Sequence, residues 1–104
     1  MTFPTALSYD DVLLVPKYSD IVSRKEVDLT SALDNSRSLS LPIISSPMDT
    51  ITESSMANAM SEAGGLGIIH RYNSIEMQAQ LAYEVKDITR RAAAIGITGD
   101  YLER

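Results

Sequence analysis

Apolar and polar residues alternate along the chain in a pattern that predicts strands and helices in turn. Three short apolar runs are typical of strands buried on both faces, at 43–44, 66–69 and 92–97. Apolar residues recur at helical spacing after the first two runs, at 50–63 and 75–88. A further helix is predicted to begin at 101–104. This order is typical of an α/β fold in which parallel strands are joined by helical crossovers.

The ends of the predicted helices carry capping signals. Thr50-Ile51-Thr52-Glu53 fits a capping box, in which the threonine oxygen and the glutamate satisfy free amides at the helix start. Gly64-Gly65 is expected to end this helix, because glycine accepts the left-handed conformation of a C-terminal cap. Asn73-Ser74-Ile75-Glu76 offers a second cap. Two buried stripes are predicted, at Met56, Ala57, Met60 and Ala63 and at Ile75, Ala79, Ala82 and Val85.

The first part of the chain differs from the rest. Residues 1–26 contain one apolar block that ends at Pro16, followed by polar stretches, and are expected to form an ordered arm with little regular structure. Residues 27–33 and 39–41 alternate between apolar and polar, and Asp34-Asn35-Ser36 has turn chemistry. A β-hairpin is therefore predicted between the arm and the α/β segment.

Polar corners follow each predicted buried strand, at 45–49, 70–73 and 98–100. Because parallel strands all point the same way, these corners are expected to share one face. That face is where both open parallel sheets and closed barrels bind ligands. Ser46, Met48 and His70 are therefore predicted to be neighbours.

Composition and charge exclude several classes of function. The 104 residues are 44% hydrophobic and 22% charged, which is ordinary for a globular domain. The net charge of −5 and the lack of a basic patch argue against nucleic acid as a partner. No cysteine is present and His70 is the single histidine, so the chain offers no thiol nucleophile and no zinc ligand set. Neither a membrane-spanning run nor a secretory signal is visible, and a cytoplasmic location is expected.

Four segments together resemble the IMP dehydrogenase / GMP reductase family. They are DDVLLVP, VDLTSAL, SPMDTITE and GGLGIIH, in the family's order, within a match from about Leu7 to Val85. Reductases of the family tend to have asparagine before the methionine of the corner and no Thr-Glu pair after it. Pro47 and Thr52-Glu53 therefore favour the dehydrogenase.

The resemblance implies an α/β fold that is the N-terminal portion of a (β/α)8 TIM barrel. A complete barrel typically needs about 250 residues, so the chain would supply about two and a half β/α units after the arm and hairpin. The expected division is an N-terminal arm at 1–26 and the start of the catalytic barrel at 27–104. Dehydrogenases of the family usually insert a pair of CBS domains, but here 84–91 runs straight into Ala92, so no CBS insert is expected.

The resemblance also implies an activity. IMP dehydrogenase oxidises IMP to XMP with NAD in guanine nucleotide synthesis, through attack by a cysteine thiolate and later hydrolysis. The cysteine, the phosphate-binding loops and the site of a monovalent cation, potassium by expectation, belong to parts outside this chain. The 104 residues alone are therefore not expected to be active, although the complete enzyme is expected to be a homotetramer. The alternatives are GMP reductase, which uses NADPH to deaminate GMP to IMP, and a non-catalytic barrel fragment.

Six site residues are carried over by the resemblance. Ser46, Met48 and Asp49 are predicted to bind the purine nucleotide, and His70, Arg71 and Ser23 to contact the cofactor. Four of them have a structural alternative. Ser46 is also a typical turn residue, Met48 a typical core residue, and Asp49 a carboxylate favoured before a helix N-terminus. By default, His70 is a satisfied structural histidine.

Overall fold

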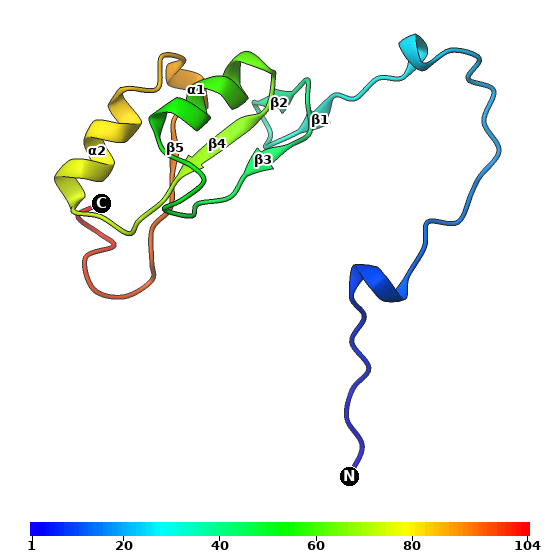
Figure 1. Cartoon of the computed structure of the whole chain (residues 1–104), viewed down its shortest axis with the longest axis horizontal. Helices are drawn as coiled ribbons and strands as arrows, with labels where there is room; N and C mark the ends of the chain where they lie inside the picture. Colours follow the sequence, from blue (N-terminus) through cyan, green and yellow to red (C-terminus); the bar gives the residue numbers. More distant parts are fainter.

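The computed structural model describes residues 1–104 as an arm, a hairpin and an α/β unit in chain order (Figure 1). The arm contains two short 3-10 helices, η1 (Tyr9–Asp11) and η2 (Arg24–Glu26). The hairpin consists of β1 (Ser31–Ala32) and β2 (Ser38–Leu39). The α/β unit consists of β3 (Ile44–Ser45), α1 (Ser54–Glu62), β4 (Leu66–Ile69), α2 (Ile75–Tyr83), η3 (Ile88–Arg90) and β5 (Ala92–Ala93).

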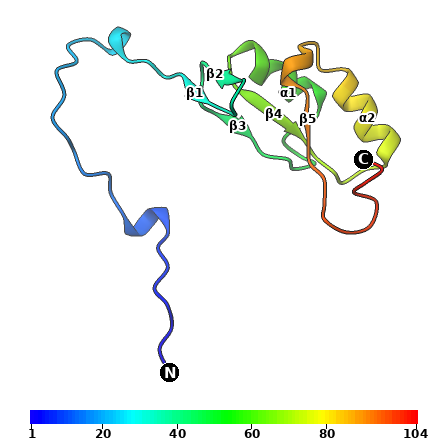
Figure 2. The same cartoon turned by 180° about the vertical axis from the view of Figure 1, so that it is seen from behind.

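The strands of the α/β unit form one parallel sheet in the order β3-β4-β5. Ile44 pairs with Leu66, and Ile68 pairs with Ala92. Helix α1 packs on β3 and β4, and α2 packs on β4 and β5 (Figure 2). The predicted alternation of parallel strands and helices is therefore confirmed. No helix of the chain combines the length and the apolar character that crossing a membrane requires.

The core of this unit is small and lies between the two helices and β4. Ala57, Ile69, Leu81 and Val85 form its buried cluster. Helix α1 approaches β4 closely, because a Cβ added to Gly67 would lie 2.6 Å from the Cα of Ala57. Only 11 of the 104 residues are buried, so most apolar side chains still face solvent.

Helix α1 ends where the sequence predicts but begins later. Gly64 has a φ of +94° and closes the helix in the left-handed conformation, as expected. The start is at Ser54, and Glu53 is the N-cap residue without a capping side-chain bond. The predicted capping box over 50–53 is therefore wrong. The physical reason is that residues 49–51 form a separate turn, in which the Met48 carbonyl accepts from the amides of Ile51 and Thr52 at 3.0 Å each. The Thr52 hydroxyl then donates to the Ser46 carbonyl at 2.6 Å.

Helix α2 begins as predicted and ends early. Ser74 caps it, because its Oγ accepts from the backbone N–H of Met77 at 3.1 Å. The helix stops at Tyr83 instead of continuing to 88. Three side chains predicted in the buried stripes are exposed, namely Met56, Ala63 and Ala79. On α2 the buried positions are Gln78 and Leu81.

The last predicted strand is shorter than expected, and the last predicted helix is replaced by a turn. Strand β5 stops at Ala93 because its partner β4 stops at Ile69, and one further bond joins Ala94 N–H to the Ile69 carbonyl at 2.9 Å. Residues 95–97 therefore have no ladder to join. The helix expected at 101–104 is a turn, in which the amides of Glu103 and Arg104 both bond the Asp100 carbonyl.

The predicted hairpin is present, with β1 and β2 antiparallel. Asp34 organises its turn, since its Oδ1 accepts from the backbone N–H groups of Ser36 and Arg37 at 2.8 Å each. The Arg37 guanidinium also bonds Asp34 Oδ2 at 2.7 Å. These bonds, with the Arg37 side chain contributing most, hold the pKa of the Asp34 carboxyl well below its ordinary value of 3.8.

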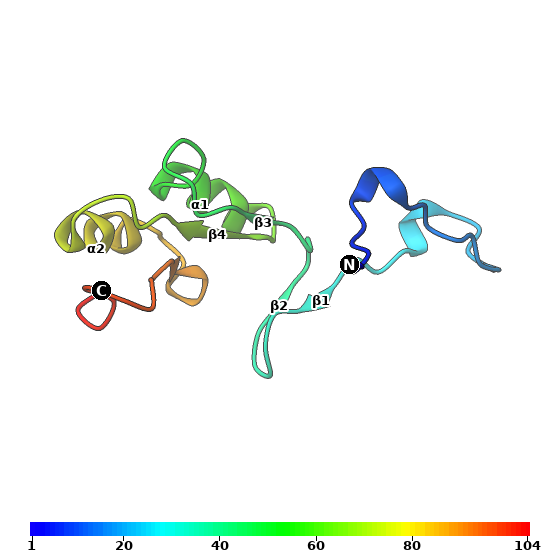
Figure 3. The same cartoon turned by 90° about the horizontal axis from the view of Figure 1, so that it is seen from below.

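The arm extends away from the α/β unit, and its apolar side chains are exposed (Figure 3). Tyr9, Leu13 and Leu14 are each more than nine-tenths exposed. The radius of gyration is 18.1 Å, whereas a compact chain of this length has one of about 13 Å. The arm therefore contributes no burial to the core.

Candidate functional site

The carboxyl ends of the three parallel strands lie on the same side of the sheet. We call this side the rim and define it as the loops 46–52, 70–73 and 94–100. The first two loops are joined directly, because the backbone N–H of His70 donates to the Thr52 carbonyl at 3.4 Å. The third is joined to the second through Gln78, whose Nε2 donates to the carbonyls of His70 and Ala94. The three corners that the sequence predicts on one face are therefore brought together.

Hydrogen bonds within the loop after β3 hold its backbone in place. The Ser46 carbonyl accepts from the Met48 N–H at 2.8 Å and from Thr52 Oγ1 at 2.6 Å. The Met48 carbonyl accepts from the amides of Ile51 and Thr52 at 3.0 Å each. Thr52 is fully buried, and its Oγ1 also lies 2.9 Å from Ser45 Oγ. The side chains of Ser46 and Met48 are consequently left exposed on a fixed backbone.

Asp49 lies on the side of this loop that faces the start of α1. Its side chain is exposed and borders a hollow of about 410 Å³. The hollow is lined by Asp49, Thr50, Ile51, Glu53, Ser55, Met56 and Ala59. Asp49 is therefore the one member of the predicted substrate group that borders this hollow.

His70 ends β4 with its ring buried and only 4% of the residue exposed. Its Nδ1 accepts from the Tyr72 N–H at 3.1 Å, so the proton of the neutral ring belongs on Nε2. Nε2 makes no hydrogen bond of standard geometry, but Glu53 Oε1 lies 3.5 Å away. The ring therefore lies between the end of β4 and the start of α1.

Arg71, in contrast, presents its side chain to solvent. Its guanidinium lies 5.7 Å from the centre of the Tyr72 ring and takes part in none of the ion pairs of the chain. A Cβ added to Gly96 would lie 3.7 Å from Arg71 Nη1, so this side chain also faces the loop after β5. Arg71 is thus an unpaired cation on the rim.

Ser23 lies in the arm, which extends away from the α/β unit (Figures 1 and 3). Its Oγ accepts from the Lys25 N–H at 3.3 Å and caps η2. The structure does not bring Ser23 to the rim, and its predicted contact with a cofactor stays a prediction.

Two residues that support the rim were not predicted as site residues. In the sequence Thr52 belongs to the predicted capping-box segment and to the Thr52-Glu53 pair, and Gln78 belongs to no predicted site. A signal for Gln78 exists in the sequence, because it interrupts the apolar face of its helix between Ile75 and Leu81. A polar side chain on a buried face needs hydrogen-bond partners, so it marks a buried polar contact.

The rim offers groups for binding and orientation but no thiol. The chain has no cysteine. Ser46 supplies a hydroxyl, Met48 a polarizable thioether and Arg71 a guanidinium. These groups suit a ligand with phosphate or hydroxyl oxygens and a flat apolar part.

Residues 6–104 match the model of the IMP dehydrogenase / GMP reductase domain. The inosine-5'-monophosphate dehydrogenase of Nitrosopumilus maritimus is 50% identical over 101 residues, which are 97% of this chain and 20% of that protein. The crystal structure of IMP dehydrogenase from Legionella pneumophila superposes with a TM-score of 0.80 at 41% identity, over 95% of this chain and 30% of that one. A GMP reductase from Trypanosoma brucei superposes with a TM-score of 0.75 at 51% identity, over 81% of this chain and 18% of that one.

The chain thus spans about a fifth of the length of the curated relative from Nitrosopumilus maritimus. Its α/β arrangement with parallel strands matches part of the solved IMP dehydrogenase structure. The resemblance noted in the sequence is confirmed by these comparisons, and the chain belongs to the IMP dehydrogenase / GMP reductase family.

Proposed function

We propose that this chain supplies the first part of the catalytic barrel of an IMP dehydrogenase. In this proposal residues 1–26 are the arm and residues 27–104 are the start of a (β/α)8 barrel without a CBS insert. The complete enzyme oxidises IMP to XMP with NAD, and its cysteine nucleophile, potassium site and phosphate loops come from other parts of the barrel. The complete enzyme is a cytoplasmic homotetramer. This chain binds and orients ligands and performs no bond-breaking step itself.

The loop after β3 carries the proposal. Its backbone is held by four internal hydrogen bonds to two carbonyls, and Ser46 and Met48 point outward from it. A loop that is fixed before the ligand arrives loses little conformational entropy on binding. Ser46 Oγ would bond a ribose or phosphate oxygen of IMP, and Met48 would pack against the purine. Asp49 would support this contact from the side of α1.

The loop 70–73 carries a side chain that would suit a phosphate group of the cofactor. NAD, when bound, accepts a hydride from the substrate. Arg71 is exposed and has no carboxylate partner, which suits a phosphate group of a dinucleotide. His70 would act with it. Because its ring is buried against Glu53, the contribution of His70 is to hold the end of β4 in place.

GMP reductase is the second candidate, and the similarity to the Trypanosoma brucei enzyme favours it. In that case the same rim would bind GMP and NADP. Pro47 and the Thr52-Glu53 pair favour the dehydrogenase in the sequence. A non-catalytic role of the chain in assembly is the third possibility, and the absence of cysteine is consistent with it.

Two hybrid enzymes test the proposal. In the dehydrogenase hybrid, this chain replaces the superposed segment of the Legionella pneumophila IMP dehydrogenase, and in the reductase hybrid it replaces that of the Trypanosoma brucei GMP reductase. The proposal predicts that the dehydrogenase hybrid forms NADH from IMP and NAD at a rate within about tenfold of its parent, a difference of about 1.4 kcal/mol in barrier. Activity of the reductase hybrid alone would favour the second candidate. Inactivity of both folded hybrids would contradict a catalytic role.

A further inference from the structure

Gln78 is a polar side chain in the buried face of α2, with 3% of the residue exposed. Its Nε2 donates to the His70 carbonyl at 3.1 Å and to the Ala94 carbonyl at 2.7 Å. These two carbonyls directly follow the ends of the neighbouring strands β4 and β5. The last backbone bond between these strands joins Ala94 N–H to the Ile69 carbonyl. The Gln78 amide therefore continues the sheet beyond the point where the backbone ladder ends.

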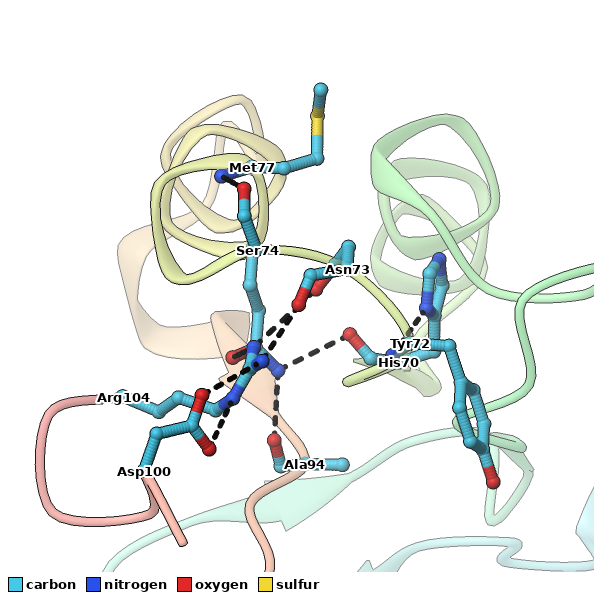
Figure 4. A network of polar contacts seen from close by, with 9 residues as sticks. His70, Tyr72, Asn73, Ser74, Met77, Ala94, Asp100 and Arg104 are labelled. Atoms are coloured by element: carbon cyan, nitrogen blue, oxygen red, sulfur yellow. Dashed lines mark hydrogen bonds and ion pairs between the residues drawn. The ribbon is translucent and has the colours of Figure 1, made fainter.

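The oxygen of the same amide is also engaged. Gln78 Oε1 accepts from Arg104 Nη1 at 3.0 Å, and Arg104 Nη2 donates to the Asn73 carbonyl at 2.6 Å. The Arg104 side chain is only 9% exposed, and its guanidinium forms an ion pair with Asp100 at 3.2 Å. Figure 4 shows Arg104, Asp100 and Asn73 around this contact, with the carbonyls of His70 and Ala94 beside it. The loop after β5 is thereby fastened at both of its ends, near Ala94 and near Asp100.

This loop is the surface that faces Arg71. A Cβ added to Gly96 would lie 3.7 Å from Arg71 Nη1, whereas Gln78 itself is buried beneath the rim. The Gln78 contacts reach the ends of β4 and β5 but not the loop after β3, which carries Ser46 and Met48. A change at Gln78 should therefore act on one part of the rim and spare the other.

We propose that Gln78 is a positioning residue that holds the loop 94–100 beside Arg71 and so sets the affinity for the dinucleotide cofactor without touching it. The part of this inference that concerns the cofactor rests on the proposed function. The part that concerns the loop stands on the hydrogen bonds alone.

The test uses Gln78→Met and Gln78→Glu in the dehydrogenase hybrid. Methionine keeps the approximate volume and removes every hydrogen bond. Glutamate keeps an acceptor for Arg104 but removes both donors to the carbonyls. Gln80→Met is the matched control, because Gln80 lies on the same helix and makes one exposed bond to Glu84. All variants are compared with the unchanged hybrid by hydrogen exchange, by NAD titration and by steady-state kinetics.

Both Gln78 variants are expected to speed hydrogen exchange in the peptide 94–104, in which the amides of Ala94, Glu103 and Arg104 are hydrogen-bonded, and Gln80→Met is not. In both, Kd and KM for NAD should rise about tenfold, equivalent to about 1.4 kcal/mol. KM for IMP and kcat should stay within about twofold of the unchanged hybrid, a difference of about 0.4 kcal/mol. Agreement of the glutamate and methionine variants would assign the effect to the two donors.

Unchanged exchange at 94–104 in the Gln78 variants would overturn the inference. A parallel rise of KM for IMP and NAD would also overturn it, because that pattern indicates general loss of structure. If methionine prevents folding, the glutamate variant decides by the same criteria. If the unchanged hybrid folds but does not oxidise IMP, the proposed function has failed, and hydrogen exchange at 94–104 still decides whether Gln78 holds the loop.

Discussion

Replacing Thr52 by valine removes the one side-chain hydroxyl that closes the loop after β3. Thr52 is fully buried, and its Oγ1 donates to the Ser46 carbonyl at 2.6 Å. Valine has nearly the same shape, so the main loss is this hydrogen bond. The Ser46 carbonyl keeps one donor, the Met48 N–H at 2.8 Å, and is therefore not left without a partner. We expect a local cost of about 1–2 kcal/mol.

This loss of local stability should increase the rate of hydrogen exchange in the loop after β3. Local opening of the loop 46–52 becomes about 5- to 30-fold more frequent for a loss of about 1–2 kcal/mol. Mass spectrometry of the corresponding peptide from the dehydrogenase hybrid measures this change. KM for IMP should rise in the same variant, because Ser46 and Met48 then lose their fixed positions.

Thr52→Ser is the matched variant, since it keeps the hydroxyl and loses only a methyl group. Its loop should exchange at a rate close to that of the unchanged hybrid. Thr50→Val is the surface control, because Thr50 is exposed. Equal acceleration in the serine and valine variants would refute the reasoning, since loss of the hydroxyl would then matter no more than loss of the methyl group.

Three other predictions concern the stability of the fold. Gly64→Ala should lower the thermal unfolding temperature of the dehydrogenase hybrid more than Gly99→Ala does. Both glycines have positive φ, but only at Gly64 would the new Cβ clash with a neighbour, Ser40 Oγ. Equal shifts of the unfolding temperature would contradict this. Below about pH 3.8 the hairpin should progressively lose the stability that Asp34 contributes, because its pKa is lower in the folded than in the unfolded chain. Exchange of residues 31–39 should therefore show less pH dependence in Asp34→Asn, and an unchanged profile would exclude Asp34 as the cause. The isolated 104-residue chain should show no cooperative melting by circular dichroism, because only 11 residues are buried; a sharp transition would disprove this.

The order and direction of the elements could be predicted because local signals decide them. The apolar run at 66–69 and the glycines before it fix a buried strand after a helix end, and the structure has β4 and the left-handed Gly64 there. Boundaries were less predictable because they depend on distant partners. Strand β5 ends at Ala93 because β4 ends at Ile69, and this pairing is not encoded in the residues 92–97 themselves.

The site shows the same division between local and distant effects. The meeting of the Ser46 loop with His70 follows from parallel strands alone and was predictable. The start of α1 was not, because residues 50–53 fit a capping box locally, whereas in the fold they close a turn on the Met48 carbonyl and Thr52 bonds the Ser46 carbonyl. The burial of Gln78 was visible as a polar gap in an apolar stripe, whereas its partners Ala94 and Arg104 depend on how β5 and the following turn are placed.

The most direct test of the proposed substrate contact is KM for IMP in the dehydrogenase hybrid after Ser46→Ala. A lost hydrogen bond to a charged ligand should raise KM about 10- to 100-fold. Ser55→Ala is the control, because Ser55 is exposed and lines the hollow beside α1. The account predicts a large rise for Ser46→Ala and none for Ser55→Ala. An unchanged KM in Ser46→Ala, with the enzyme active, would show that the loop after β3 does not face the nucleotide.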